Sequence, residues 1–174
     1  VTTIQFTLGL FVSLLLNMGL KGTRFFRTLF FLPVILGVTI QGLMWTLFLY
    51  PLGGPMQSFL ELFGIQSLFL GGQPMEAFAW VIVVQIWSNL GFTMVIFLAG
   101  LQGIPPDLYE AAAIDGAGRY RQIIHVTLPG LRNPLIFTAL VTSILAFRVF
   151  DQVQIMTHGG PRHATTTVMY EAVQ

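Results

Sequence analysis

Long apolar runs alternate with more polar connections along the 174 residues of this chain. Four runs are long enough to cross a bilayer, since a spanning helix needs about 20 mostly apolar residues. They cover residues 1–20, 28–50, 77–101 and 131–157, and another run starts near residue 167. Lipid offers backbone groups no hydrogen-bond partners, and the runs lack the alternating polarity of barrel strands. They are therefore predicted to be helices.

The composition supports lipid as the solvent of these runs. Hydrophobic residues make up 55% of the chain and charged residues 9%, whereas a soluble domain carries roughly a quarter charged residues. The net charge of +1 gives no indication of a nucleic-acid partner. The absence of cysteine excludes disulfides, thiolate nucleophiles and cysteine metal sites. The predicted fold class is all-α, a polytopic transmembrane helical bundle.

The chain starts without methionine and ends just after the last run begins. We therefore expect a fragment, with about four complete spans and part of a fifth. A signal peptide is not expected at residues 1–20, because the basic flank and the small-residue cleavage site are missing.

Basic residues gather in two of the connections and predict the orientation. Residues 21–27 and the connection at 102–133 together hold six of the eight Lys and Arg residues, whereas residues 51–76 hold none. The positive-inside rule therefore places the 102–133 loop in the cytoplasm and the 51–76 connection outside it. In that outer connection, the apolar stretch 59–70 lies between glycines and prolines and predicts a short surface helix.

The cytoplasmic loop is longer than a simple linker needs to be and carries its own helix signals. Two prolines precede Asp107, and good helix formers follow, which predicts a helix over 107–114 with Asp107 as its cap or in its first turn. Gly116 and Gly118 are expected to end or bend this helix. A second short helix is predicted over 120–126, stopping before Pro129. The alanines at 111–113 would let another backbone approach closely.

These residues carry a resemblance. Glu110, Ala111, Ala112 and Gly116, followed by residues 126–129, resemble the EAA motif of permeases in binding-protein-dependent ABC importers. Val126 stands where the family form has isoleucine, which keeps a β-branched apolar side chain. The wider chain is similar to the maltose-type sugar permeases over nearly all of its length. The matching segments are residues 25–27, 97–101, 150–152 and 159–161.

The resemblance implies a type I ABC importer permease fold and a multi-pass subunit of the bacterial inner membrane. Such a subunit would form the pathway for a sugar or a related polar solute, with a non-sugar solute such as glycerol-3-phosphate as the alternative. The resemblance also implies several partners: cytoplasmic ATPase subunits, a second permease subunit in a heterodimer, a periplasmic or extracellular solute-binding protein, and membrane lipid.

In this family the loop docks on the ATPase as a coupling helix. The residues expected to couple are Glu110, Ala111, Ala112, Asp115, Gly116, Leu128 and Pro129. Glu110 would offer its charge to a basic group, Asp115 would cap or pair with Arg119, and Gly116 would supply a backbone conformation that a side chain hinders. A merely solvated helix face remains the alternative for Glu110 and Asp115.

ATP is expected to bind to the partner subunits. The chain has no G-x-x-x-x-G-K-[ST] phosphate loop, and its single lysine, Lys21, follows no glycine-rich turn. No cofactor and no metal are expected in this chain, because the three histidines are scattered and lack a ligand set.

Polar residues inside the spans are candidates for lining a solute pathway, because they are costly when they face lipid. Gln85, Ser88 and Asn89 share one helix face, which Thr93 continues. Hydrogen bonding between helices is the alternative. Arg148 and Asp151 are spaced to pair along the fourth run, in either a structural or a solute-contacting role. Trp80 and Trp87 would stack on a sugar or anchor the interface.

Two other classes of protein are the alternatives, a membrane-embedded enzyme and a passive channel. A membrane-embedded enzyme would use Asp151, His158 or His163, but it would need titratable groups clustered at one depth with a positioned partner. A passive channel would not need a long helical loop with an alanine face. The sequence therefore favours a transport subunit that is not an enzyme.

Overall fold

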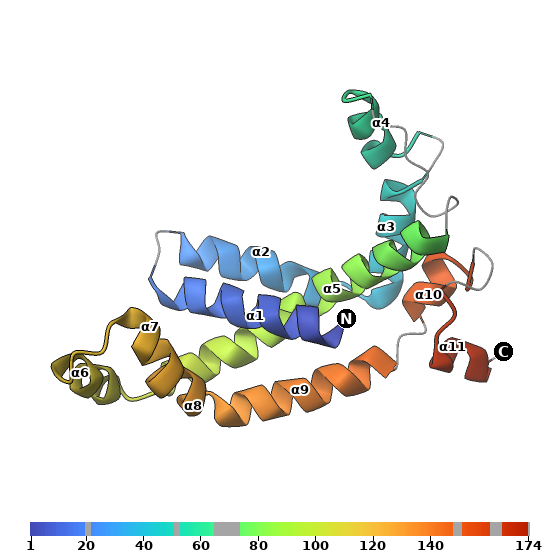
Figure 1. Ribbon diagram of the computed structural model, residues 1–174. Coiled ribbons are helices and arrows are strands. Elements are labelled where there is room, and N and C mark those ends of the chain that lie inside the picture. Colours follow the sequence, from blue (N-terminus) through green and yellow to red (C-terminus); the bar gives the residue numbers. More distant parts are fainter. Residues whose placement is uncertain (20–21, 51–52, 65–73, 148–150, 161–164, 174) are drawn as a thin grey trace. The chain divides into compact units, whose positions relative to one another are not determined.

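A computed structural model of the chain describes residues 1–19, 22–50, 53–64, 74–147, 151–160 and 165–173. All the regular elements in these ranges are helical, which confirms the all-α prediction (Figure 1). They are α1 Thr2–Asn17, α2 Thr23–Ile35, α3 Val38–Phe48, α4 Pro55–Glu61, α5 Pro74–Gln102, α6 Pro106–Ile114, α7 Arg119–Gln122, the π-helical turn η1 Ile123–Thr127, α8 Leu128–Gly130, α9 Arg132–Phe147, α10 Asp151–Met156 and α11 Val168–Val173.

The helices belong to two compact units. The first unit contains Val1 and residues 32–89 and 144–174, and the second contains residues 2–31 and 90–143. Helix α5 contributes its first half to the first unit and its second half to the second unit.

The second unit is held together by close packing of α1 against the second half of α5. One face of α1 is buried and consists of Gln5, Gly9, Ser13 and Leu16, spaced three and four residues apart. A Cβ atom built on Gly9 would lie 2.5 Å from Thr93 Cγ2, so only glycine permits this approach. The Gln5 amide donates a hydrogen bond to Thr93 Oγ1 at 3.1 Å. The polar groups of this face therefore stay satisfied away from water.

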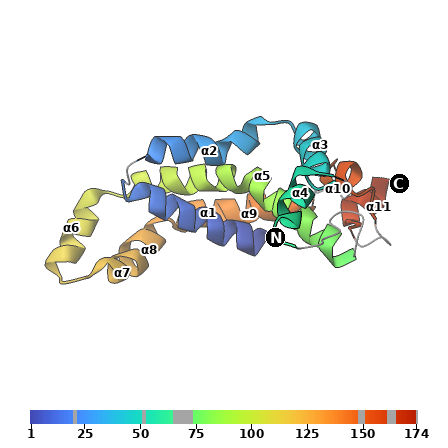
Figure 2. The ribbon, with the colours of Figure 1, turned by 90° about the horizontal axis from the view of Figure 1, so that it is seen from above.

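Basic residues of the second unit lie toward one of its ends. Figures 1 and 2 both show that the start of α2, helices α6 to α8 and the start of α9 lie at this end. Arg24 and Arg27 lie on α2, Arg119 and Arg121 on α7, and Arg132 begins α9. The structure thus gathers at one end five of the six positive charges that the positive-inside argument assigns to the cytoplasm; the sixth, Lys21, lies outside the described ranges.

The first unit is built on α3, α10 and the first half of α5. Leu49, Val84 and Met156 form one buried cluster, and Val81, Val153 and Tyr170 form another. Gly42 on α3 lies so close to α10 that a Cβ atom there would be 2.9 Å from Ile155 Cγ2.

The helix lengths differ from the predicted spans. In the described ranges, α5 is the one helix that is long and apolar enough to cross a membrane by itself. Two bent pairs of helices, residues 23–48 and 119–146, bring the number of candidate spans to three if each pair counts as one span. Helix α1 has 16 residues and is shorter than the predicted run 1–20. The run 28–50 is interrupted between Ile35 and Val38. The run 131–157 contains α9 and α10, and residues 148–150 lie outside the described ranges.

The short helix of the 51–76 connection also differs from its prediction. Helix α4 starts at Pro55 and ends at Glu61, whereas the predicted helix covers 59–70, of which residues 65–70 lie outside the described ranges. Proline fits the first turn of a helix, where its missing N–H has no helical partner, so Pro55 favours the earlier start.

The predicted stop before Pro129 is wrong. Helical backbone continues from Arg119 through the π-turn and Pro129 to Gly130. Proline inside an α-helix removes one backbone bond and crowds the preceding turn. The wider π-turn that ends at Thr127, directly before Leu128 and Pro129, accommodates the proline without ending the helix.

Candidate functional site

Helix α6 presents most of the predicted coupling residues to solvent. Pro106 occupies its first turn together with Asp107, and no side chain caps the helix start. Glu110 and Ala111 are exposed, whereas Ala112 is half-buried. Ile114 is 87% exposed, although it is a large apolar residue in a loop predicted to face the cytoplasm. Helix α6 therefore exposes a charged, a small and a large apolar side chain.

Gly116 ends α6 in a left-handed conformation. Its φ is +77°, and its N–H donates to the Ala113 carbonyl at 3.0 Å. The N–H of Ala117 donates to the Ala112 carbonyl at 2.8 Å. These two bonds form a Schellman motif, in which a glycine satisfies carbonyls at the end of a helix. A Cβ atom on Gly116 would meet nothing within 4 Å, so the backbone conformation is what requires glycine.

Tyr109 fastens α6 to the helical run that leads into α9. Its ring packs against a buried cluster of Leu101, Ile104 and Leu131. Its hydroxyl lies 3.1 Å from the hydroxyl of Thr127, which is 3% exposed. The side chain therefore links α6 to both α5 and the π-turn. The sequence analysis missed Tyr109, although an aromatic residue within a polar loop is a signal for such an anchor.

The remaining coupling candidates lie on both sides of the Gly116 turn. Asp115 and Arg119 are both exposed, and no ion pair joins them in this described part of the loop, so the predicted local pair is not formed. Asp115 is instead the C-cap residue, directly after the last residue of α6. Leu128 is half-buried and Pro129 is exposed. A cavity of about 320 Å³ lies beside Tyr109 and is also lined by Asn17, Arg119 and Gln122.

Part of the predicted polar face of α5 is buried in the first unit. Gln85 is 6% exposed and Ser88 is 7% exposed. The Asn89 amide donates a hydrogen bond to the backbone carbonyl of Gln85 at 3.0 Å. Thr93, farther along α5, belongs to the second unit and accepts the Gln5 bond described above.

Two glutamines absent from the predicted set complete this polar row. The Ser88 hydroxyl donates to the Gln41 side-chain oxygen, and the Gln152 amide lies 3.5 Å from Ser88 Oγ. Gln41 comes from α3 and Gln152 from α10, so three helices contribute. Both are polar residues inside predicted spans, which was the available signal. The row therefore shows helix-to-helix bonding, which is one of the two expected roles. A role in lining a solute pathway stays a prediction.

An aromatic cluster lies in the same unit. The Trp45 ring centroid is 6.2 Å from that of Trp80 and 5.5 Å from that of Trp87. The Trp45 Nε1–H is buried and has no hydrogen-bond partner among the described residues. Trp80 thus lies tilted against Trp45, Trp87 packs edge-to-face on it, and the buried indole N–H of Trp45 belongs to the same cluster.

The other predicted residues give less information. Arg148 lies outside the described ranges, and Asp151 is the first residue of α10. His158 adopts a left-handed backbone with φ of 48° in a turn. Within the described ranges, no three His, Asp or Glu side chains gather as a metal site would require.

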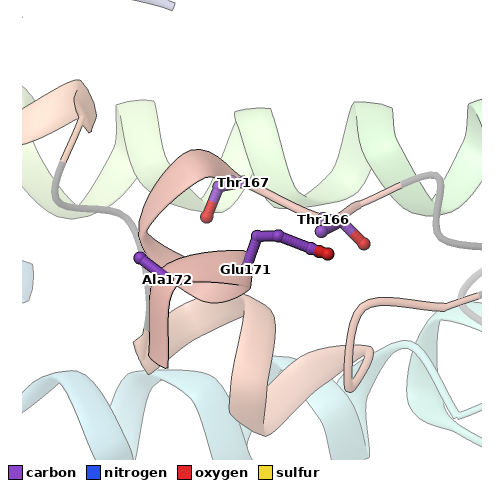
Figure 3. Close-up of a pocket in the computed structure, with 4 residues that line it drawn as sticks. All are labelled: Thr166, Thr167, Glu171 and Ala172. Carbon is purple, nitrogen blue, oxygen red and sulfur yellow. The ribbon is translucent and has the colours of Figure 1, made fainter. Parts of the chain in front are cut away.

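An open cavity of about 480 Å³ lies near the end of the chain. Thr166, Thr167, Glu171 and Ala172 line it, and Figure 3 shows the Glu171 side chain extended toward Thr166. None of these residues was predicted as a site. The Thr166 hydroxyl is buried without a hydrogen-bond partner in the described part of the chain.

Comparisons with known proteins decide the family. Residues 5–172 match the model of the family described as "Binding-protein-dependent transport system inner membrane component". The chain belongs to this family.

Two curated relatives of the permease carry solute names. The chain is 36% identical over 166 residues to the "Trehalose/maltose transport system permease protein MalF" of Thermococcus litoralis, covering 95% of the chain and 56% of the relative. It is 32% identical over 173 residues to the "sn-glycerol-3-phosphate transport system permease protein UgpA" of Yersinia enterocolitica, covering 98% of the chain and 58% of the relative. The permease chain thus spans little more than half the length of these relatives.

A solved structure supports the fold of the permease. A bacterial alginate ABC transporter in complex with an alginate pentasaccharide-bound periplasmic protein matches with a TM-score of 0.80 and 25% identity. The match covers 97% of this chain and 59% of that one. The permease is therefore an all-α component of an inner-membrane transport system, and its fold is that of ABC importer permeases.

Proposed function

We propose that the permease is a multi-pass subunit of an ATP-driven importer in a bacterial inner membrane, and that it forms the pathway for a sugar or a related polar solute. The observation that carries this proposal is helix α6. It exposes Glu110 and Ala111 to a partner, while Tyr109 fastens it to α5 and the π-turn. The trehalose/maltose and sn-glycerol-3-phosphate names of the relatives support a polar solute.

The coupling step is proposed to run through α6 and the helical run after it. An ATPase subunit would receive α6, with Glu110 paired to a basic group, Ala111 and Ala112 allowing close approach, and Asp115 and Gly116 ending the helix. Leu128 and Pro129 continue the same helical run toward α9. Because Tyr109 joins α6 to Thr127 in this run, a displacement of α6 would move the start of α9 with it.

The solute is proposed to pass the polar row of α5. Gln85 and Asn89 supply amide groups, and Arg148 and Asp151 remain candidates from the fourth run. Amides both donate and accept hydrogen bonds, as sugar hydroxyls do, so they suit a neutral polyhydroxyl solute. The buried Nε1–H of Trp45 offers a further donor to a solute.

Membership of the family supports the other subunits that we propose for the importer. ATP would bind to two ATPase subunits, a second permease subunit would complete a heterodimer, and a periplasmic or extracellular solute-binding protein would deliver the solute. The permease itself would then perform no covalent chemistry.

The test is purification of the full-length permease from its native membrane, with identification of the bound subunits and measurement of solute-stimulated ATP hydrolysis. We expect an ATPase to co-purify with the wild type. Ala111→Trp, on the exposed face of α6, should release or uncouple it. Ser58→Trp is the matched control, because Ser58 is also exposed on a short helix, α4, of the outer connection. Absence of an ATPase from the wild-type preparation contradicts the proposal.

A further inference from the structure

The interruption between α2 and α3 leaves backbone carbonyls that need donors. Helix α2 ends at Ile35 and α3 starts at Val38, so the last carbonyls of α2 lose their helical partners. The Leu36 N–H reaches the Pro33 carbonyl at 3.1 Å. Carbonyls without partners are costly in lipid, and breaks in spanning helices persist only where other groups satisfy them.

Gln41 satisfies these carbonyls with its side chain. Its Nε2 lies 2.6 Å from the Pro33 carbonyl oxygen and 2.8 Å from the Leu36 carbonyl oxygen. The residue is 3% exposed. Because both neighbours of Nε2 are acceptors, the orientation of the amide is fixed and its two hydrogens are used. The side-chain oxygen is then left to accept the hydroxyl hydrogen of Ser88.

The bonds form a chain with one direction. Gln152 Nε2 points to Ser88 Oγ, Ser88 donates to Gln41, and Gln41 donates to the break. Every donor in the chain is turned toward the break. The acceptor end is the amide oxygen of Gln152, which accepts no hydrogen bond from the residues that the structure describes. Gln152 as a whole is 5% exposed, and its oxygen is the acceptor at the end of this chain of bonds.

We propose that Gln41 is a positioning residue for solute recognition: by tying the break to Ser88, it turns the Gln152 amide so that its oxygen accepts a hydroxyl of the solute. This inference rests on the proposed import of a polar solute. Without Gln41, the Ser88 hydroxyl is free to rotate and the Gln152 amide is free to flip. The Gln152 side chain would then present either its NH2 group or its oxygen to the solute, and the recognition of a solute hydroxyl would weaken.

The experiment uses the complete importer in proteoliposomes. The KM and kcat of solute-stimulated ATP hydrolysis are measured with maltose, trehalose, xylose and sn-glycerol 3-phosphate, and with deoxy analogues of whichever solute stimulates the wild type. Gln41→Met keeps the length of the side chain and removes its amide. Thr46→Val is the control on the same helix, because among the described residues the Thr46 hydroxyl bonds only to the Gly42 carbonyl of its own helix.

We expect Gln41→Met to raise KM by about tenfold, the loss of one to two hydrogen bonds, with a smaller change in kcat. Its preference for the solute over the deoxy analogue should shrink. Thr46→Val should keep the wild-type KM and preference. An unchanged KM and preference in Gln41→Met, with only a lower yield of folded importer, overturns the inference and leaves Gln41 as a support of the helix break.

Gln152→Met provides a second route if Gln41→Met does not assemble, because it leaves the bonds at the break intact. It should raise KM for the same solute by a similar factor, and the double variant should be no worse than the worse single variant. A wild-type KM in Gln152→Met overturns the inference. If the wild-type importer itself responds to none of the solutes, the proposed import of these solutes fails, which is a different result.

Discussion

The turn at Gly116 allows a sharp test of how the coupling helix ends. Gly116 and Gly118 are two residues apart, and a Cβ atom on either would meet nothing within 4 Å. They differ in backbone conformation, because φ is +77° at Gly116 and −68° at Gly118. Alanine at the two positions therefore separates backbone strain from side-chain bulk.

The expected magnitudes follow from these angles. An L-residue in the left-handed region costs about 1–2 kcal/mol, which lowers the ratio of intact to distorted turn roughly 5- to 30-fold for Gly116→Ala. Gly118→Ala should change the free energy by less than about 0.5 kcal/mol, because reduced chain entropy offsets a poorer N-cap. Gly116→Asn should fall between them, since asparagine tolerates the left-handed region better.

The assay is solute-stimulated ATP hydrolysis by the complete full-length importer, with the amount of bound ATPase measured in the same preparation. We expect activity to decrease in the order wild type, Gly118→Ala, Gly116→Asn, Gly116→Ala. A loss in Gly116→Asn at least as large as in Gly116→Ala would show that side-chain bulk against the partner decides the effect. Wild-type activity in Gly116→Ala would refute the strain argument.

Three further predictions concern contacts elsewhere. Gly91→Ala should destabilise the permease by about 1–3 kcal/mol in thermal unfolding, because the new Cβ would overlap the Phe30 carbonyl oxygen. Tyr109→Phe should cost about 1 kcal/mol and speed amide hydrogen exchange in α6 about fivefold, because the bond to Thr127 is lost. Trp45→Phe should change the free energy of unfolding by less than about 1 kcal/mol, because the lost N–H is buried and has no partner among the described residues, which offsets the lost ring contact. The KM for solute should rise.

Each of these predictions has a control or a contrary outcome. Gly103→Ala should be tolerated, because its Cβ would lie no closer than 3.4 Å to any atom considered. Thr127→Val should cost at least as much as Tyr109→Phe, because it also removes the 3.4 Å bond from the Thr127 hydroxyl to the Gln122 carbonyl. The double variant should be no worse than Thr127→Val alone. A destabilisation above about 3 kcal/mol in Trp45→Phe would show that the indole N–H has a partner.

Local signals predicted helix α6 well. The structure starts α6 at Pro106 and ends it at Ile114, one residue longer than the predicted 107–114. Asp107 lies in the first turn and Gly116 takes the positive φ, as the helix-end signals indicate. These features depend on neighbours within a few residues, so they can be read from one segment alone.

Features that depend on distant residues were missed. Pro33 marks a weak point in the run 28–50, but the break is satisfied by Gln41, which in turn contacts Ser88 on α5. The helix through Pro129 depends on a π-turn whose Thr127 is held by Tyr109, eighteen residues earlier in the chain. Apolar periodicity contains no information about such pairings, because it reports which face is buried and not what that face contacts.

The hydrogen bonds of the polar row also bear on where the energy of import would come from. Gln41 and Ser88 are buried and bonded to protein groups, so a solute hydroxyl that bonds to the Gln152 oxygen exchanges a hydrogen bond with water for one with the protein. Such an exchange contributes only about 0.5–1.5 kcal/mol per bond. Solute binding at the row therefore supplies discrimination but little net work. The displacement that opens the pathway must be driven from outside the row, which is the role we assign to an ATPase acting on α6.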